Sequence, residues 1–70
     1  MGVEVFMAPA TSHVARMEWD DESEDLRVTY TDGSVYVALN CTRREWQQAQ
    51  TARPIGAFLN RHFRGRLSPA

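Results

Sequence analysis

Two short strand-like runs joined at Asp32-Gly33 constrain the fold more than any other stretch of this chain. The first run, residues 26–30, reads Leu-Arg-Val-Thr-Tyr and alternates apolar with polar side chains, as half-buried β-strands do. The second, residues 35–39, reads Val-Tyr-Val-Ala-Leu and is rich in β-branched and aromatic residues. Because Asp-Gly favours the positive φ that a tight turn needs, the pattern predicts a β-hairpin.

The length of the turn decides which side of this hairpin faces the core. A two-residue loop at 32–33 turns the side chain of Tyr36 outward. A three-residue loop at 31–33, with the glycine in a bulge, pairs Tyr30 with Ser34 and turns Tyr36 inward. The two registers differ by one residue, and we favour the bulged one.

A third strand precedes the hairpin. Residues 14–19 place alanine, methionine and tryptophan on one side, against arginine and glutamate on the other. Residues 20–25 hold five carboxylates, which could suggest calcium, but they lack the glycine and terminal glutamate of an EF-hand loop. We interpret them as a solvated acidic turn. The result is a three-stranded antiparallel meander.

Residues 1–11 allow two interpretations, a loose tail or a short edge strand. Val3 and Val5 alternate with a glutamate, and Pro9 would end a strand there. Chain ends are often poorly ordered, which slightly favours the tail. An apolar edge strand would need a partner, so self-association or a protein partner is the alternative that this segment suggests. The candidate partner-binding residues are Val3, Val5, Phe6 and Tyr36.

Two helices are expected after the sheet. Thr42 and Glu45 form a capping box, which opens a helix of about ten residues with Trp46 as its anchor. A second helix should run from Pro54 to Arg64 and stop before a glycine, followed by a frayed end. Its inward stripe consists of Ile55, Phe58, Leu59, His62 and Phe63, whereas Asn60, Arg61 and Arg64 fall on the opposite side.

The sequence therefore predicts an α+β domain, a three-stranded antiparallel meander packed on one face by two C-terminal helices. The domain should span residues 12–67, between the N-terminal segment 1–11 and a tail at 68–70. Replacing Phe58 with alanine should cost about 3–5 kcal/mol. The expected core consists of Met17, Trp19, Leu26, Val28, Tyr30, Trp46, Ile55, Phe58, Leu59 and Phe63.

Composition limits the function classes. Seventy residues make one small domain, and the single Cys41 excludes an intramolecular disulfide and a cysteine-based zinc cage. No apolar run approaches the roughly 20 residues that span a bilayer, and the N-terminus lacks the cationic region of a signal peptide. We expect a cytoplasmic protein with no membrane contact and no cofactor.

No set of residues indicates catalysis. Ser12 and His13 are adjacent, but a nucleophile and its base need an orienting third group. His62 lies on the apolar helix stripe and is expected at the edge of the core. Cys41 precedes a helix N-cap, which could lower its thiol pKa, yet a small half-buried residue is the favoured interpretation. We expect that the protein is not an enzyme.

Charge is segregated along the chain. Residues 1–40 hold eight acids and two arginines, a net of −6, and residues 41–70 hold one acid and six arginines, a net of +5. Lysine is absent, so either codon bias or the planar guanidinium's suitability for phosphate explains the arginines. The second interpretation predicts contacts with RNA or another nucleic acid. Its candidate residues are Arg43, Arg44, Arg53, Arg61, Arg64 and Arg66.

From residue 12 to residue 67 the order of features resembles the KTSC family, named for the C-terminal domain of some lysyl-tRNA synthetases. The features that carry this resemblance are Ser12, Val14, Trp19-Asp20, the strand 26–30, Gly33, Tyr36, Trp46, the segment 56–60 (Gly-Ala-Phe-Leu-Asn) and the segment 64–67 (Arg-Gly-Arg-Leu). The chain departs from the pattern at Ala38, where a second tyrosine is frequent, at residues 40–42 and at Pro54.

This resemblance implies a small, non-catalytic α+β domain that occurs as a synthetase appendage or as a free-standing bacterial or phage protein. Its association with a tRNA enzyme suggests RNA as a partner. The expected function is thus an accessory binding module that contacts RNA or another nucleic acid, with a protein-interaction module as the alternative.

Overall fold

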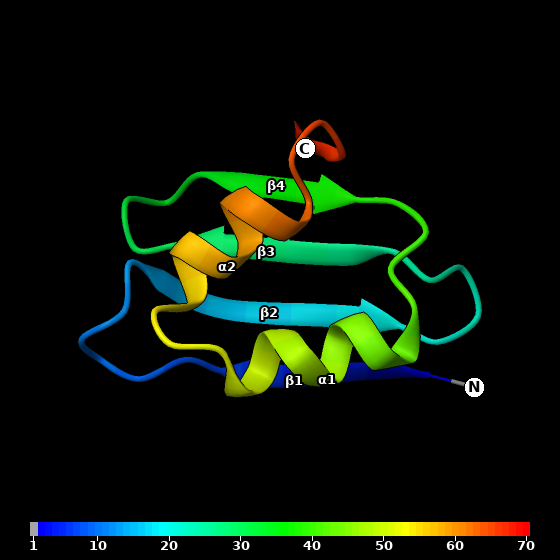
Figure 1. The fold of residues 1–70 in the computed structure, drawn as a ribbon, viewed down its shortest axis with the longest axis horizontal. Helices are drawn as coiled ribbons and strands as arrows, with labels where there is room; N and C mark the ends of the chain where they lie inside the picture. Colours follow the sequence, from blue (N-terminus) through cyan, green and yellow to red (C-terminus); the bar gives the residue numbers. More distant parts are fainter. Residues whose placement is uncertain (1) are drawn as a thin grey trace.

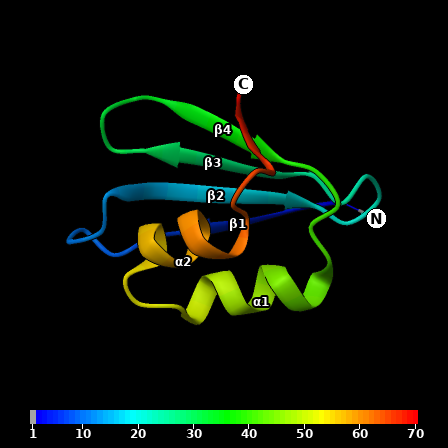
Figure 2. The same ribbon diagram turned by 45° about the horizontal axis from the view of Figure 1, so that its top comes forward.

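A computed structural model describes residues 2–70 as an α+β fold, a five-stranded antiparallel sheet with two helices on one face (Figure 1). The strands lie in the order β1-β2-β3-β4-β5, and Figure 2 shows both helices on the same side of the sheet. The elements are β1 Val3–Met7, β2 Val14–Asp20, β3 Leu26–Tyr30, β4 Val35–Ala38, α1 Arg43–Thr51, α2 Ile55–His62 and β5 Leu67–Pro69.

The β3–β4 hairpin adopts the bulged register. Tyr30 N donates to Ser34 O at 2.9 Å, and Gly33 N donates to Tyr30 O at 3.0 Å. Gly33 has a φ of +92°, a conformation that glycine adopts without the Cβ penalty of other residues. Because Val28 pairs with Tyr36, the Tyr36 side chain lies on the same face as buried Val28, and it is half-buried there. The three-residue loop is confirmed.

The expectation of three strands is wrong, because both chain ends add an edge strand. β1 pairs with β2, with Val5 opposite Glu18. The loose tail that we slightly favoured is therefore not what forms. β5 pairs with β4, with Leu67 opposite Ala38, where the sequence predicted a frayed end. Both additions are short strands stabilised by pairing with a distant segment, which a local alternation pattern does not reveal.

Local signals predicted the helices well. Thr42 Oγ1 accepts from Glu45 N at 3.2 Å, and Glu45 Oε1 accepts from Thr42 N at 3.0 Å, which confirms the capping box of α1. α2 begins directly after Pro54 and ends at His62, two residues earlier than predicted. The following turn contains a glycine at positive φ, Gly65 at +83°.

The core lies between the helices and the sheet. Eight of the ten predicted core residues are buried, and Phe58 and Tyr30 are only partly buried. The α2 stripe is narrower than predicted, because Ile55, Leu59 and Phe63 point to the sheet while Phe58 lies at its margin. The buried residues are Val14, Met17, Trp19, Leu26, Val28, Ala38, Cys41, Trp46, Ala49, Ile55, Leu59 and Phe63.

Within residues 2–70, neither helix has the length and apolar character needed to cross a membrane.

Candidate functional site

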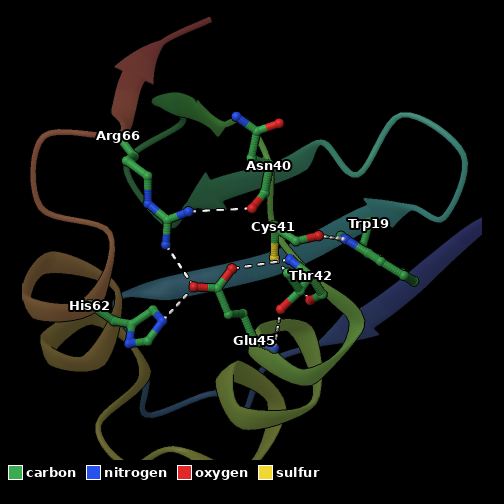
Figure 3. Close-up of polar contacts among 7 residues, drawn as sticks. All are labelled: Trp19, Asn40, Cys41, Thr42, Glu45, His62 and Arg66. Atoms are coloured by element: carbon green, nitrogen blue, oxygen red, sulfur yellow. Dashed lines mark hydrogen bonds and ion pairs between the residues drawn. The ribbon is translucent and has the colours of Figure 1, made fainter.

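One carboxylate, Glu45, connects the start of α1 to the residues at and after the end of α2 (Figure 3). Its Oε2 accepts from Arg66 Nη2 at 2.7 Å and lies 2.7 Å from His62 Nε2, while its Oε1 caps Thr42 N. Arg66 also donates to Asn40 O at 3.3 Å. We call Thr42, Glu45, His62 and Arg66 the Glu45 cluster. It joins the first turn of α1 to the end of α2 and to the segment before β5.

The Glu45 cluster lowers the pKa of its carboxylate and so favours the ionised form. Burial alone raises the pKa of Glu45, but hydrogen bonds from Arg66, Thr42 N and His62 outweigh it and lower the pKa to about 2. Burial and the charge of Glu45 raise the pKa of the neighbouring Cys41 thiol to about 12. Cys41 is fully buried, so the helix-dipole activation considered from the sequence does not occur.

His62 lies at the edge of the core, as expected, but it is exposed and does not belong to the buried stripe of α2. Its ring stacks on Phe58 at 5.0 Å between centroids and meets Phe63 edge-on, also at 5.0 Å. Its Nε2 faces Glu45, and the residue as a whole is exposed. This explains why the apolar spacing misplaced it: an imidazole can contact two rings and a carboxylate at the same time.

A second internal ion pair ties β1 to α1. Arg43 Nη1 donates to Glu4 Oε2 at 3.0 Å, and its guanidinium lies 4.8 Å from the centre of the Trp19 ring. Glu4 Oε1 accepts from Trp46 Nε1 at 2.8 Å, and the two tryptophan rings stack at 6.2 Å. The hydrogen bonds from Trp46 and Arg43 lower the pKa of Glu4. Arg43 is therefore engaged within the fold.

The six arginines proposed to bind nucleic acid divide into two groups. Arg43 and Arg66 pair with internal glutamates, and Arg53 donates to the carbonyls of two preceding residues, at 3.0 and 2.6 Å. The other three are exposed, and within residues 2–70 their side chains make no hydrogen bond or ion pair. This second group, the unpaired arginines, consists of Arg44, Arg61 and Arg64.

An open cleft of about 510 Å³ lies between the tip of the β3–β4 hairpin and α2. Two tyrosine rings, Tyr30 and Tyr36, meet edge-to-face in it with centroids 5.7 Å apart. We call this feature the tyrosine cleft. Its lining residues are His13, Tyr30, Thr31, Asp32, Ser34, Tyr36, Asn60 and Leu67.

The side chains of the tyrosine cleft have hydrogen-bonding capacity to spare. Within the described residues, the side chains of His13, Asn60 and both tyrosines make no hydrogen bond. Asp32 Oδ1 accepts from Ser34 N at 2.9 Å and from Ser34 Oγ at 2.6 Å, and Oδ2 is not used by Ser34. These bonds lower the pKa of Asp32, so the cleft contains an anion at neutral pH.

Tyr30 of the cleft remains protonated over the physiological range. Burial, the neighbouring Tyr36 and the charge of Asp32 raise the pKa of Tyr30. A protonated phenol both donates and accepts a hydrogen bond. The cleft thus offers aromatic surface together with a carboxylate, an amide and two hydroxyl groups.

Two other candidate sites can now be placed. Ser12 Oγ accepts from Val14 N at 3.0 Å and so closes the turn before β2, while His13 lines the tyrosine cleft. Of the candidate partner-binding residues, Val3 and Val5 are 58% and 55% exposed, and Phe6 packs partly against the core. The sequence did not select Met7, which is 67% exposed beside them. Within residues 2–70, no group of three or more metal-ligating side chains occurs.

Comparison with known families matches residues 10–66 to the KTSC domain, most of the chain. The chain belongs to the KTSC family. Comparisons with curated proteins and with solved structures give no significant match. Two positions that carried the resemblance, Tyr36 and Asn60, meet in the tyrosine cleft, and a third, Gly33, forms the adjacent turn. At Ala38, where the family often has a second tyrosine, this KTSC domain has a buried residue opposite Leu26.

Sequence reasoning missed the tyrosine cleft as a site, although it considered several of its residues singly. Tyr30 was assigned to the core, Asn60 to the outward helix face and His13 to an improbable catalytic pair. The usable signal was the bulged register, which places Tyr36 on the inner face next to Tyr30. Placing Asn60 beside them required the packing of α2, which no local pattern contains.

Proposed function

We propose that this KTSC domain is a non-catalytic accessory module that contacts single-stranded RNA through its unpaired arginines. One observation carries the proposal: Arg61 and Arg64 are exposed and their side chains have no polar partner among residues 2–70, and they lie one and four positions beyond Asn60, which lines the tyrosine cleft. Proteins follow an unpaired strand by combining cationic side chains with aromatic rings, and the half-buried Tyr30 and Tyr36 line the same cleft as Asn60. Arg44 adds a third free cation on α1.

Only some of the six arginines expected to contact nucleic acid are free to do so. Arg43 and Arg66 would have to leave a glutamate, and Arg66 also its position 4.6 Å over the Phe63 ring, before they could meet a phosphate. Breaking the partly buried hydrogen bond between Arg66 and Glu45 costs about 1.5–3 kcal/mol, which would offset what one phosphate contact contributes. The more exposed Arg43–Glu4 pair contributes less, because solvent screens it. The unpaired arginines bear no such cost. The proposed RNA contact therefore relies on Arg61 and Arg64, with Arg44 in support.

A salt titration tests the proposal. Binding of a fluorescent single-stranded RNA should weaken with salt by roughly 0.7 log units of affinity per log unit of salt for each phosphate contacted. The double variant Arg61→Gln/Arg64→Gln should lower affinity for all sequences alike and flatten the slope by about 1.4, because two contacts are lost. The absence of binding by the wild-type protein at about 50 mM salt would overturn the proposal.

The matched control is Arg16→Gln/Arg27→Gln, which removes the same charge from the sheet face that the helices do not cover. Arg16 pairs at 3.7 Å with Glu18 there, and Arg27 lies opposite Glu18 on β3. This variant should keep most of the affinity and the full salt slope. Equal losses in the two double variants would mean that net charge alone drives binding, and would contradict a site at α2.

A second candidate, a homodimer through β1, is favoured by the exposed apolar side chains of Val3, Val5 and Met7. Gly2 O and Ala8 N bond toward β2, so the backbone groups of the three exposed residues face the open edge. Antiparallel pairing about Val5 would place Val3 of one copy opposite Met7 of the other. Light scattering of the wild-type protein and of Val5→Lys tests this proposal: a wild-type protein with monomeric mass at high concentration would exclude it.

A further inference from the structure

The tyrosine cleft differs from an ordinary surface depression in the chemistry of its walls. Two perpendicular rings supply aromatic surface, and four kinds of polar group converge on the same space. Its volume of about 510 Å³ lies within the range of small-molecule sites. Two backbone amides beside it, Tyr30 N and Thr31 N, already donate to Ser34 O and His13 O, whereas the side chains of the cleft keep free hydrogen-bonding capacity.

We propose that the tyrosine cleft holds one unpaired guanine base of an RNA strand, stacked on a tyrosine ring and read by Asp32 and Asn60. The inference rests on the proposed function, because Arg61 and Arg64 would hold the phosphates that flank the base. It assigns a chemical class of ligand to the tyrosine cleft. It also gives Asp32, Asn60 and the two tyrosines a recognition role in addition to that of the unpaired arginines.

Charge determines which part of a nucleotide enters the cleft. Asp32 is an anion at neutral pH, so a phosphate beside it would be repelled. An ionised carboxylate only accepts hydrogen bonds, and it therefore selects a ligand edge rich in N–H donors. The base enters and the phosphates stay outside, where the unpaired arginines lie.

The identity of the base follows from the order of donors and acceptors. Guanine carries two neighbouring donors, N1–H and the N2 amino group, beside the acceptor O6. The carboxylate of Asp32 meets the donors, and the Asn60 amide can donate to O6. Uracil presents a single donor flanked by acceptors, whereas adenine and cytosine offer an amino group without the second donor. The expected order of affinity is guanine first, adenine and cytosine next, and uracil last.

Stacking supplies the affinity that is common to all bases. An aromatic side chain contributes roughly 1–3 kcal/mol per stacked base. Tyr30 and Tyr36 stand at an interplanar angle of 89°, so a base lying on one ring contacts the edge of the other. The tyrosines thus give affinity with little preference for one base, and Asp32 and Asn60 give the preference.

Two titrations of the full chain test the proposal. In the first, amide NMR spectra follow the addition of GMP, AMP, CMP and UMP, with tyrosine-cleft resonances as the readout. In the second, binding of hexanucleotides with one G or one U among adenines is measured against salt. We expect GMP to shift the resonances of residues 30–36 and Asn60, and the G-containing strand to bind about tenfold more tightly than the U-containing one.

Three variants separate the roles. Asp32→Asn keeps the acceptor that Ser34 uses, and it should remove the guanine preference without flattening the salt slope. Asn60→Ala should reduce the preference by several-fold, and Tyr36→Ala should weaken all bases alike. Thermal melting of each variant verifies that the domain is folded. An undiminished guanine preference in folded Asp32→Asn would overturn the proposal.

The two proposals fail in different ways. If RNA binds in a salt-dependent manner through Arg61 and Arg64 but no mononucleotide shifts the cleft resonances, the guanine site is wrong and the RNA-binding surface stands. If no strand binds at about 50 mM salt while GMP shifts the cleft, the base site stands and the proposed function is wrong. Equal shifts with all four mononucleotides would contradict the assignment of guanine.

Discussion

The Glu45 cluster and the tyrosine cleft contain similar kinds of polar side chain, but they use them in opposite ways. In the Glu45 cluster, one carboxylate receives Arg66, His62 and the Thr42 amide. In the tyrosine cleft, the phenol hydroxyls, the imidazole of His13 and the Asn60 amide make no hydrogen bond within the described part of the chain. The hydrogen bonds of the first region join the start of α1 to the end of α2 and to the segment before β5. The second region keeps its hydrogen-bonding groups available to a ligand.

This difference shows why the nearby arginines must not be treated as one basic patch. Arg66 belongs to the cluster and holds the end of α2 in place, whereas Arg61 and Arg64 project from the same part of the chain without such a role. Charge count along the sequence treats all three alike. If the comparison holds, substitutions in the Glu45 cluster lower the free energy of unfolding, whereas substitutions in the tyrosine cleft lower the affinity for a ligand.

The largest expected effect lies in the core beneath the Glu45 cluster. Phe63 is fully buried, packs edge-on against Phe58 and carries Arg66 over its ring. Phe63→Ala should destabilise the domain by about 3–5 kcal/mol, enough to unfold much of a chain this small, as measured by urea denaturation. The sequence assigned this cost to Phe58. Since Phe58 is only half-buried, Phe58→Ala should cost less than Phe63→Ala, and the reverse order would contradict the packing of α2.

The next effect comes from the carboxylate itself. Glu45→Gln leaves Arg66 and His62 without their acceptor charge and should cost about 1.5–3 kcal/mol, read from the urea midpoint at pH 7. Glu18→Gln is the control, because its exposed pair with Arg16 spans 3.7 Å and should contribute less than about 1 kcal/mol. Equal costs for the two variants would mean that the Glu45 cluster is no more than a surface ion pair.

Acid should weaken the Glu45 cluster in a defined pH window. The folded-state pKa of Glu45 is about 2, below its ordinary value of 4.5, so its contribution is present above pH 4.5 and is lost as the pH falls toward 2. Partial solvent screening reduces this contribution to about 1–2 kcal/mol. The free energy of unfolding of the wild-type protein, minus that of Glu45→Gln, should shrink between pH 5 and pH 2. A constant difference would show that the carboxylate is not stabilised by folding.

The smallest expected effect lies in the tyrosine cleft. Tyr36→Phe removes a hydroxyl group that makes no hydrogen bond to any of residues 2–70, so the free energy of unfolding measured with urea should change by less than about 0.5 kcal/mol. The ring and its edge-to-face contact with Tyr30 remain. A loss above about 1 kcal/mol would show that the hydroxyl group stabilises the fold, and would remove the contrast with the Glu45 cluster.

Local features were predictable because a few neighbouring residues determine them. Asp32-Gly33 sets the hairpin, the bulged register follows from the turn, and Thr42 with Glu45 caps α1. Each signal depends on interactions across at most a few positions, so the sequence contains all the participants. The KTSC resemblance rested on the same stretches and was confirmed.

Only the tertiary structure decided how distant segments combine. Whether residues 3–7 and 67–69 become strands depends on the free edges of β2 and β4, since short runs gain stability from pairing rather than from their own propensity. The same holds for function. The Arg66 guanidinium is occupied because a Glu45 carboxylate oxygen lies 2.7 Å away, and Asn60 lines the same cleft as Tyr36 because α2 packs against the sheet. Residues 20 or more positions apart meet through burial of the shared core, and their charges and hydrogen bonds acquire a role only once that core has brought them together.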